Sequence, residues 1–293
     1  KKQRDRARIK FLIAKLGVKE FKRLVLEERQ TLQPDPRWTA FLDGVERYAE
    51  RPLKPPTFLN GQKRPEGFDA WYATNIYRQK QAGYVVAAVT LPLGDLSSWQ
   101  MRELASLARR FSGDSVRTTV EQNIVLRWVS ETDLPDLYRE LVRIGLGAPG
   151  AGTIVDVTAC PGTDTCKLGI SSSRGLAGEL RTRLAAKSFN LDQAVRNLRI
   201  KVSGCFNSCG QHHIADLGFY GTTLTIGNRK VPHFQVVLGG KWQGNAGAYG
   251  LSLGRVPSKR IPDGSARSTD SDGHERKGYG RVHGSLSATG SQD

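Results

Sequence analysis

The chain contains four cysteines, which stand in two pairs: Cys160, Cys166, Cys205 and Cys209. Five residues separate the members of the first pair and three separate those of the second. Both pairs lie in polar segments with glycines, which predict loops that present sulfur to a ligand. Four thiolates brought together can hold an iron–sulfur cluster, and the backbone N–H groups of such turns can donate to its sulfurs. An iron–sulfur cluster is therefore the first interpretation of this pattern.

Three other uses of the cysteines are open. A pair of structural disulfides is disfavoured because we expect a cytoplasmic protein, in which thiols stay reduced. Structural zinc is a stronger rival, but zinc knuckles have shorter spacings than that between Cys160 and Cys166. Four buried, unliganded thiols would need apolar neighbours, which these polar segments do not supply.

Strand-like runs precede each cysteine loop and must position it. They cover residues 153–157 and 198–202. Two neighbouring strands would deliver both loops to one edge of a sheet. We expect a helix at 173–187 between them and further strands at 216–219 and 233–238.

The cysteine spacing also carries a resemblance. A glycine before Cys205 and Asn207 between the last two cysteines complete a pattern that resembles the sirohaem and [4Fe-4S] signature of the assimilatory sulfite and nitrite reductases. Further stretches are similar to the same family: Trp71 to Asn75, Gln79 to Tyr84, Arg117 to Asn123, Cys209 to Gly221 and Gly239 to Trp242. The resemblance covers about residues 1–262.

The resemblance implies a [4Fe-4S] cluster and sirohaem as cofactors. All four cysteines would ligate the cluster, and Cys209 would also bridge a cluster iron to the sirohaem iron. Asn207 would contact the macrocycle, where its amide can bind a carboxylate. The alternative for Asn207 is an ordinary turn residue.

The implied reaction is the six-electron reduction of sulfite to sulfide or nitrite to ammonia, with ferredoxin or a similar protein as electron donor. In the family, arginines and lysines above the iron face bind the anion and come mainly from the first of two similar halves. The opening residues, Lys1 to Leu12, resemble the segment that follows those lysines. We therefore expect a C-terminal half, assign no catalytic residue here, Arg117 included, and expect little turnover by this chain alone.

The expected fold class is α+β, with a ferredoxin-like half-domain followed by a sirohaem- and [4Fe-4S]-binding α+β domain. Two helices within residues 4–31, broken at Gly17, would end a preceding cofactor domain at residues 1–50. A linker at 51–80, the half-domain at 81–148 and the cluster domain at 149–262 would follow. In the half-domain we expect a strand at 84–91, a helix at 97–111, a strand pair at 115–129 and a helix at 134–144. Residues 263–293 are almost without apolar side chains and predict a disordered, atypical tail.

Two polar groups near the loops are candidate ligand sites. The serines at 171–173 beside Arg174 would begin a helix, where they could hold an anion or serve as ordinary N-caps. His212 and His213 would lie in a strand and point to opposite faces, so that one is packed and the other exposed.

Composition limits the partners. The formal charge is +16, which suits an anionic macrocycle, an acidic electron carrier or nucleic acid. Nucleic acid is disfavoured because the basic residues are spread along the chain without a binding motif. The sequence contains no run of 18 apolar residues, so we expect no membrane span. Two other functions are open: a zinc-stabilised basic binding module and a non-catalytic electron-transfer or assembly subunit.

Overall fold

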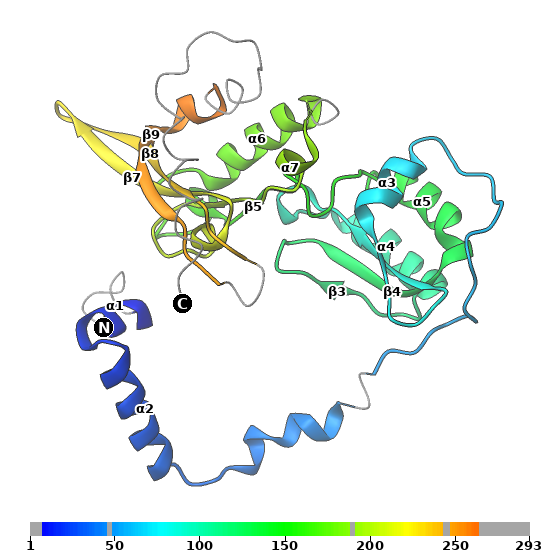
Figure 1. Cartoon of the computed structure of the whole chain (residues 1–293), viewed down its shortest axis with the longest axis horizontal. Helices are drawn as coiled ribbons and strands as arrows, with labels where there is room; N and C mark the ends of the chain where they lie inside the picture. Colours follow the sequence, from blue (N-terminus) through cyan, green and yellow to red (C-terminus); the bar gives the residue numbers. More distant parts are fainter. Residues whose placement is uncertain (1–7, 46–48, 188–190, 243–246, 264–293) are drawn as a thin grey trace, which may run out of the picture. The chain divides into compact units, whose positions relative to one another are not determined.

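The computed structural model describes residues 8–45, 49–187, 191–242 and 247–263. The chain divides into two compact units, shown in Figure 1. Unit 1 comprises residues 1–152 and 162–169, and unit 2 comprises residues 153–161 and 170–293.

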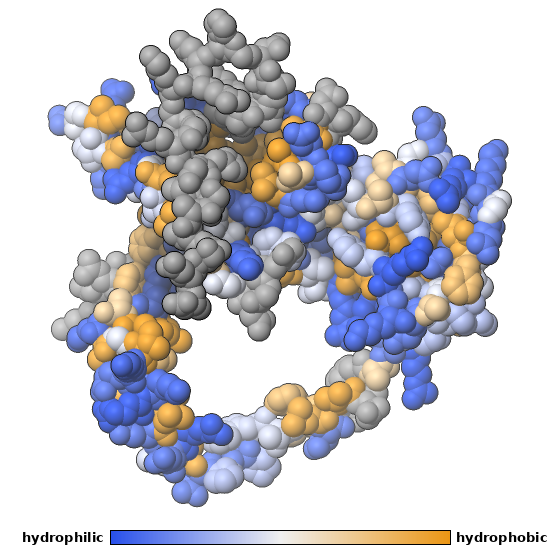
Figure 2. Space-filling model, in the orientation of Figure 1, coloured by the Kyte–Doolittle hydropathy of each residue, from blue (hydrophilic) through white to orange (hydrophobic). Residues whose placement is uncertain are grey.

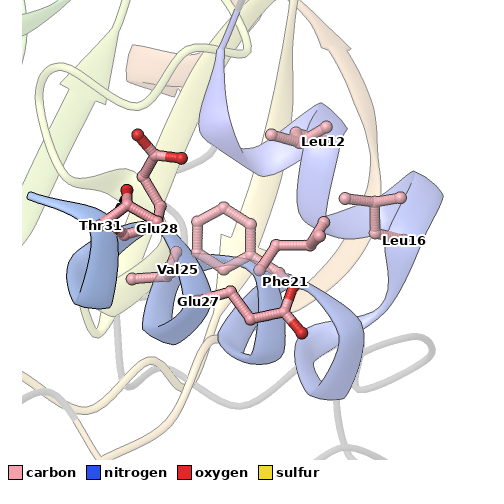
Figure 3. A pocket seen from close by; sticks show the side chains of 8 residues that line it. Leu12, Leu16, Phe21, Val25, Glu27, Glu28 and Thr31 are labelled. Atoms are coloured by element: carbon pink, nitrogen blue, oxygen red, sulfur yellow. Dashed lines mark hydrogen bonds between the residues drawn. The ribbon is translucent and has the colours of Figure 1, made fainter.

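Unit 1 begins with two helices, α1 (Ile9–Leu16) and α2 (Val18–Thr31). Gly17 separates them with a φ of 80°, which confirms the predicted break and suits glycine because other residues rarely adopt it. Apolar side chains gather over both helices (Figure 2). They line the groove in Figure 3, together with three polar residues: Leu12, Leu16, Phe21, Leu24, Val25, Glu27, Glu28 and Thr31. Two 3-10 turns follow, η1 (Pro36–Trp38) and η2 (Ala40–Gly44).

A four-stranded antiparallel sheet forms the centre of unit 1, with the order β1-β2-β4-β3. Its strands are β1 (Ile76–Arg78), β2 (Tyr84–Val89), β3 (Arg117–Thr118) and β4 (Ile124–Ser130). Its helices are α3 (Phe68–Asn75), α4 (Ser98–Phe111) and α5 (Leu134–Arg143). The described part of the unit also has the 3-10 turns η4 (Pro92–Gly94), η5 (Glu131–Asp133) and η6 (Gly162–Asp164).

The core of unit 1 joins the sheet to its helices. Val85 and Leu126 from the sheet pack in one cluster with Leu107 of α4 and Leu141 of α5. Ser97 caps α4 in a capping box with Gln100. The strand, helix, strand pair and helix expected between residues 84 and 144 are all present, within a few residues at each end.

The range 51–80, predicted as a linker, is extended only in its first part. Helix α3 and strand β1 occupy its second part, because Phe68 and Trp71 are fully buried in the core of unit 1. Asn75 at the end of α3 is also fully buried, and its amide donates to the carbonyls of Ala88 and Ala148. These apolar and polar contacts make the segment part of the unit.

Glu50 fastens the start of this extended segment to the sheet. Its carboxylate accepts from Arg117 Nε at 2.6 Å and from Arg127 Nε at 2.5 Å. Burial raises the pKa of Glu50, but hydrogen bonds from the guanidinium groups of Arg127 and Arg117 lower it. The lowering outweighs the effect of burial, so the pKa lies below its ordinary value. Arg117 is therefore engaged in an ion pair within unit 1.

Replacing Glu50 with glutamine should lower the free energy of unfolding at pH 7 by about 1–2 kcal/mol, because two charge-assisted hydrogen bonds are weakened. A depressed folded-state pKa gives stability that is present above the unfolded pKa and is lost as pH falls through the folded one. The difference between the variant and the parent should therefore shrink below about pH 4. Urea unfolding between pH 3 and pH 7 measures it, with the exposed Glu66→Gln as control. An equal difference at both pH values would contradict the role of the carboxylate.

Unit 2 is built on a five-stranded mixed sheet with the order β5-β6-β7-β8-β9. Its strands are β5 (Thr158–Ala159), β6 (Ile200–Ser203), β7 (Leu217–Ile226), β8 (Arg229–Leu238) and β9 (Leu251–Pro257). The first three are parallel, and the pairs after them are antiparallel. The helices are α6 (Ser173–Lys187) and α7 (Gln193–Arg196), and η8 (His212–Ile214) and η9 (Ser258–Arg260) are 3-10 turns.

The strand predicted at 153–157 is wrong: this segment is a turn, and the strand before the first cysteine loop is the shorter β5. The turn is closed by a hydrogen bond from Asp156 N to Thr153 O and is held by Arg181 of α6, which donates to Val155 O at 3.1 Å. Burial lowers the pKa of Arg181, and nearby Asp156 opposes this shift. Such side-chain contacts from α6 are absent from the local sequence pattern.

The α+β class is confirmed. Among the described residues, no helix has the length and apolar character needed to cross a membrane. The predicted tail falls almost wholly on residues 264–293, which lie outside the described part of the chain.

Candidate metal centre

The first cysteine loop starts beside the second one because β5 and β6 are parallel neighbours. Cys160 follows β5 directly, and its N–H donates to Val202 O in β6 at 3.1 Å. Gly204, just before Cys205, donates its N–H to the sulfur of Cys160 at 3.1 Å. The structure thus brings the ends of the two predicted loops together, and it does so at the carboxyl ends of parallel strands.

The backbone at Gly204 is the point about which both loops are organised. Its carbonyl accepts from Ile170 N at 2.8 Å and from Ser171 N at 3.0 Å, where the chain returns from the first loop. Gly221 of β7 lies behind it, so closely that a Cβ there would be 2.2 Å from Gly204 O. Only glycine fits at position 221 without moving this carbonyl.

Cys205 is the most enclosed of the four thiols, with 7% of its surface exposed. Asn207 directs its amide nitrogen toward the Cys205 sulfur at 3.4 Å. The amide oxygen of Asn207 is buried and has no hydrogen-bond partner within the described residues. The sequence allowed Asn207 to be either a macrocycle contact or a turn residue. In this structure its side-chain amide donates to the Cys205 sulfur.

Cys209 is exposed and lies in a sharply turned segment. Ser208 before it and Gln211 after it both have left-handed backbone, with φ values of 62° and 60°. A non-glycine residue in this region costs about 1–2 kcal/mol, and such strain is concentrated at functional sites. The turn folds the chain back onto β6 immediately after Cys209, where Gly210 N donates to Ser203 Oγ at 3.0 Å.

Cys166 lies in the segment 162–169, which groups with unit 1, and is exposed. Its N–H donates to Gly162 O at 3.0 Å, and its carbonyl accepts from Gly169 N at 2.9 Å, so the loop is folded on itself. All four cysteines are free thiols. Within the described residues, no three Cys, His, Asp or Glu side chains form a group that could hold a metal ion.

The serines at the start of α6 hold the protein's own backbone. Ser172 accepts from Gly175 N at 3.2 Å, which is ordinary N-capping. Ser171 donates to the carbonyls of Thr222 and His233, and Ser173 donates to Cys160 O at 2.8 Å. The capping alternative of the sequence analysis is thus the one seen at Ser172, and Ser173 positions the first cysteine.

The expectation of a strand at His212 and His213 is wrong. Both lie in η8, because Gln211 turns the chain into a 3-10 conformation. His212 is fully buried, His213 is half-buried, and their rings are 4.1 Å apart, whereas alternation in a strand would separate them. His212 Nδ1 is 2.8 Å from Ser203 Oγ in β6.

Two residues of β6 that the sequence analysis passed over hold the segment after Cys209. Lys201 is 4% exposed and donates to Gln211 Oε1 at 3.1 Å. Ser203 accepts from Gly210 N at 3.0 Å. The sequence offered one signal for these two residues. A buried strand is normally apolar, yet the short strand before this cysteine loop has a charged and a polar residue at alternate positions.

The groups around the cysteine sulfurs have the chemistry that an iron–sulfur cluster needs. Free thiols, an N–H aimed at the Cys160 sulfur and an amide aimed at the Cys205 sulfur suit an iron–sulfur cluster, whose sulfurs accept such bonds. The buried amide oxygen of Asn207 leaves a polar position at the same place for a further donor. The residues present therefore fit a cluster.

Comparison with known protein families gives two matches. Residues 77–144 match a family model described as the nitrite/sulfite reductase ferredoxin-like half domain. Residues 150–263 match one described as the nitrite and sulphite reductase 4Fe-4S domain. The half-domain and the 4Fe-4S domain that the sequence predicted are thereby confirmed as the kinds of domain present.

Individual relatives agree. The chain is 30% identical over 255 residues to a ferredoxin sulfite reductase of Mycobacterium tuberculosis, covering 85% of this chain and 41% of the relative. It is 30% identical over 188 residues to the ferredoxin–nitrite reductase of Synechococcus elongatus, covering 64% and 36%. The solved structure of Mycobacterium tuberculosis NirA protein superposes with a TM-score of 0.61 at 28% identity, covering 93% of this chain and 47% of that one. The chain thus spans less than half the length of each of these relatives.

Proposed function

The chain belongs to the nitrite and sulfite reductase family, and on that premise we propose that it carries the [4Fe-4S] cluster and the proximal sirohaem ligand for six-electron reduction of sulfite to sulfide or nitrite to ammonia. The single observation that supports this best is the convergence of both cysteine loops on Gly204, whose N–H donates to the Cys160 sulfur. The family implies a [4Fe-4S] cluster and sirohaem as cofactors.

The proposed ligand set contains one thiolate from each of the four cysteines, and Cys209 would also bind the sirohaem iron. When bound, the coupled cofactors would supply single electrons to an anion on the iron. Cys205 and Cys160 would each be steadied by the N–H donor that faces its sulfur. Asn207 would donate a hydrogen bond to the Cys205 sulfur and would also contact the edge of the macrocycle.

Ferredoxin or a similar acidic carrier is the proposed electron donor. The excess positive charge of the chain favours the approach of an acidic protein. The names of the curated relatives point to the same donor class. A cytoplasmic location is part of the proposal, because thiols that serve as cluster ligands must stay reduced.

The first experiment is an absorption spectrum with iron, acid-labile sulfide and zinc analysis, on protein made anaerobically in a host that supplies sirohaem. Sirohaem bands with about five irons per chain, four from the cluster and one from the macrocycle, are the expected result. A colourless protein with tightly bound zinc would overturn the proposal in favour of a zinc-stabilised module. A cluster spectrum without sirohaem bands would instead support an electron-transfer or assembly subunit.

A further inference from the structure

A buried lysine, Lys201, lies in the strand that leads to the second cysteine loop. Lys201 lies in the middle of β6, four residues before Cys205. In the sheet it is paired with Thr158, which is two residues before Cys160. Its ammonium group donates to the side chain of Gln211, which is two residues after Cys209.

The side chain of Lys201 lies under the segment that follows Cys209. Ser203 is two residues further along β6 and so is on the same face of the strand. Its hydroxyl contacts Gly210 N and His212 Nδ1, while Lys201 contacts Gln211. Three successive residues after Cys209 are thus fastened to one face of one strand.

Close backbone packing makes this arrangement rigid. A Cβ at Gly210 would be 2.2 Å from Val202 O, so that the segment lies directly on β6. The partner of Lys201 on the other side is Gly218 of β7, which has no side chain and leaves this face open to the segment. Lys201 is accordingly only 4% exposed.

Burying an ammonium group in a strand is costly unless a negative charge or polar groups compensate for it. A cluster held by four thiolates carries net negative charge, and that charge increases by one when an electron enters. A fixed cation close to it stabilises the reduced form, and it does so more strongly in the low dielectric of the interior than at the surface. Net charge around the cluster and hydrogen bonds to its sulfurs are known to set its reduction potential.

We infer that Lys201 is a positioning and tuning residue: its hydrogen bond to Gln211 fixes the turn that presents Cys209, and its buried charge raises the reduction potential of the cluster. This inference rests on the proposed function, because it needs a cluster at the four cysteines. Lys201 does not contact substrate or donate a proton in this role. It acts through the cluster and the loop.

The test is a redox titration of the cluster, followed by electron paramagnetic resonance, in the whole chain and its variants. Lys201→Gln removes the charge but keeps an N–H donor at the end of the side chain. It should lower the equilibrium constant for cluster reduction about tenfold, a shift of about 59 mV for a one-electron couple. Lys201→Arg keeps the charge. Its equilibrium constant for cluster reduction should stay within about threefold of the parent value, since the retained charge supplies most of the stabilisation of the reduced cluster.

The matched control is Lys230→Met, which removes an exposed lysine at the β7–β8 turn of the same unit. It should leave the potential unchanged. Lys201→Met is the second charge-removing variant and should shift the potential in the same direction as Lys201→Gln, so one variant that folds is enough. If the reduction potential of the cluster in Lys201→Gln or Lys201→Met equals that of the parent, this inference is wrong, but the proposed function is unaffected. A parent chain that binds no cluster would overturn the proposed function and this inference with it.

Discussion

Replacing Cys205 with serine should leave the purified chain almost without iron. Cys205 is the most buried of the four thiols, and its position is fixed by the Gly204 backbone on one side and the Asn207 amide on the other. A serine hydroxyl is a poor ligand for iron in a cluster. Iron and acid-labile sulfide should fall to about a tenth of the parent value or less, as expected when metal binding loses a ligand or its support.

The control for this experiment is Thr165→Ala. Thr165 is exposed and lies in the other cysteine loop, next to Cys166. It should retain the parent iron content, since its side chain supplies no sulfur. Circular dichroism of both variants checks that the fold persists. Parent-like iron content in Cys205→Ser, with the fold intact, would remove Cys205 from the ligand set.

Replacing Gly221 with alanine should destabilise unit 2 and loosen both cysteine loops together. The new Cβ would lie 2.2 Å from Gly204 O and 3.0 Å from Ser171 Cβ, so it must push the Gly204 carbonyl away. That carbonyl accepts from Ile170 and Ser171, and its residue donates to the Cys160 sulfur. Overpacking of this kind costs about 1–3 kcal/mol, and more where the neighbour is backbone.

Gly254→Ala is the matched control, because Gly254 lies in β9 of the same sheet and no atom would lie within 4 Å of its Cβ. It should change the free energy of unfolding by less than about 1 kcal/mol, with a small gain from the reduced entropy of the unfolded chain. Urea unfolding measures both variants, and iron content measured in parallel should fall only in Gly221→Ala. Equal stability of the two variants would contradict the close approach at Gly204.

The two variants separate ligand chemistry from architecture. Cys205→Ser removes a sulfur ligand and leaves the sheet unchanged. Gly221→Ala keeps all four thiols but displaces the Gly204 backbone, which holds both cysteine loops. Loss of iron in both would mean that the cysteines bind a cluster only when the loops are held at Gly204. Loss of iron in Cys205→Ser alone would mean that the thiols are sufficient.

The sequence by itself determined the kinds of domain and the candidate ligands. Cysteine spacing is a covalent property, so the pairs at 160 and 166 and at 205 and 209 could be recognised without a fold. The helix at 173–187 and the break at Gly17 were equally accessible, because helix periodicity and glycine conformation are local.

Only the tertiary structure decided how the cysteine loops are held. Residues 153–157 have strand-like composition, yet Arg181 from a distant helix fixes them as a turn. The histidines leave strand geometry because Gln211 is left-handed, a conformation stabilised by its contact with Lys201, ten residues earlier in the chain. The importance of Gly221 for Gly204 depends on strands β6 and β7 lying side by side. Close packing and hydrogen bonds between residues remote in sequence leave no local pattern, and for this reason they appear only when the chain is folded.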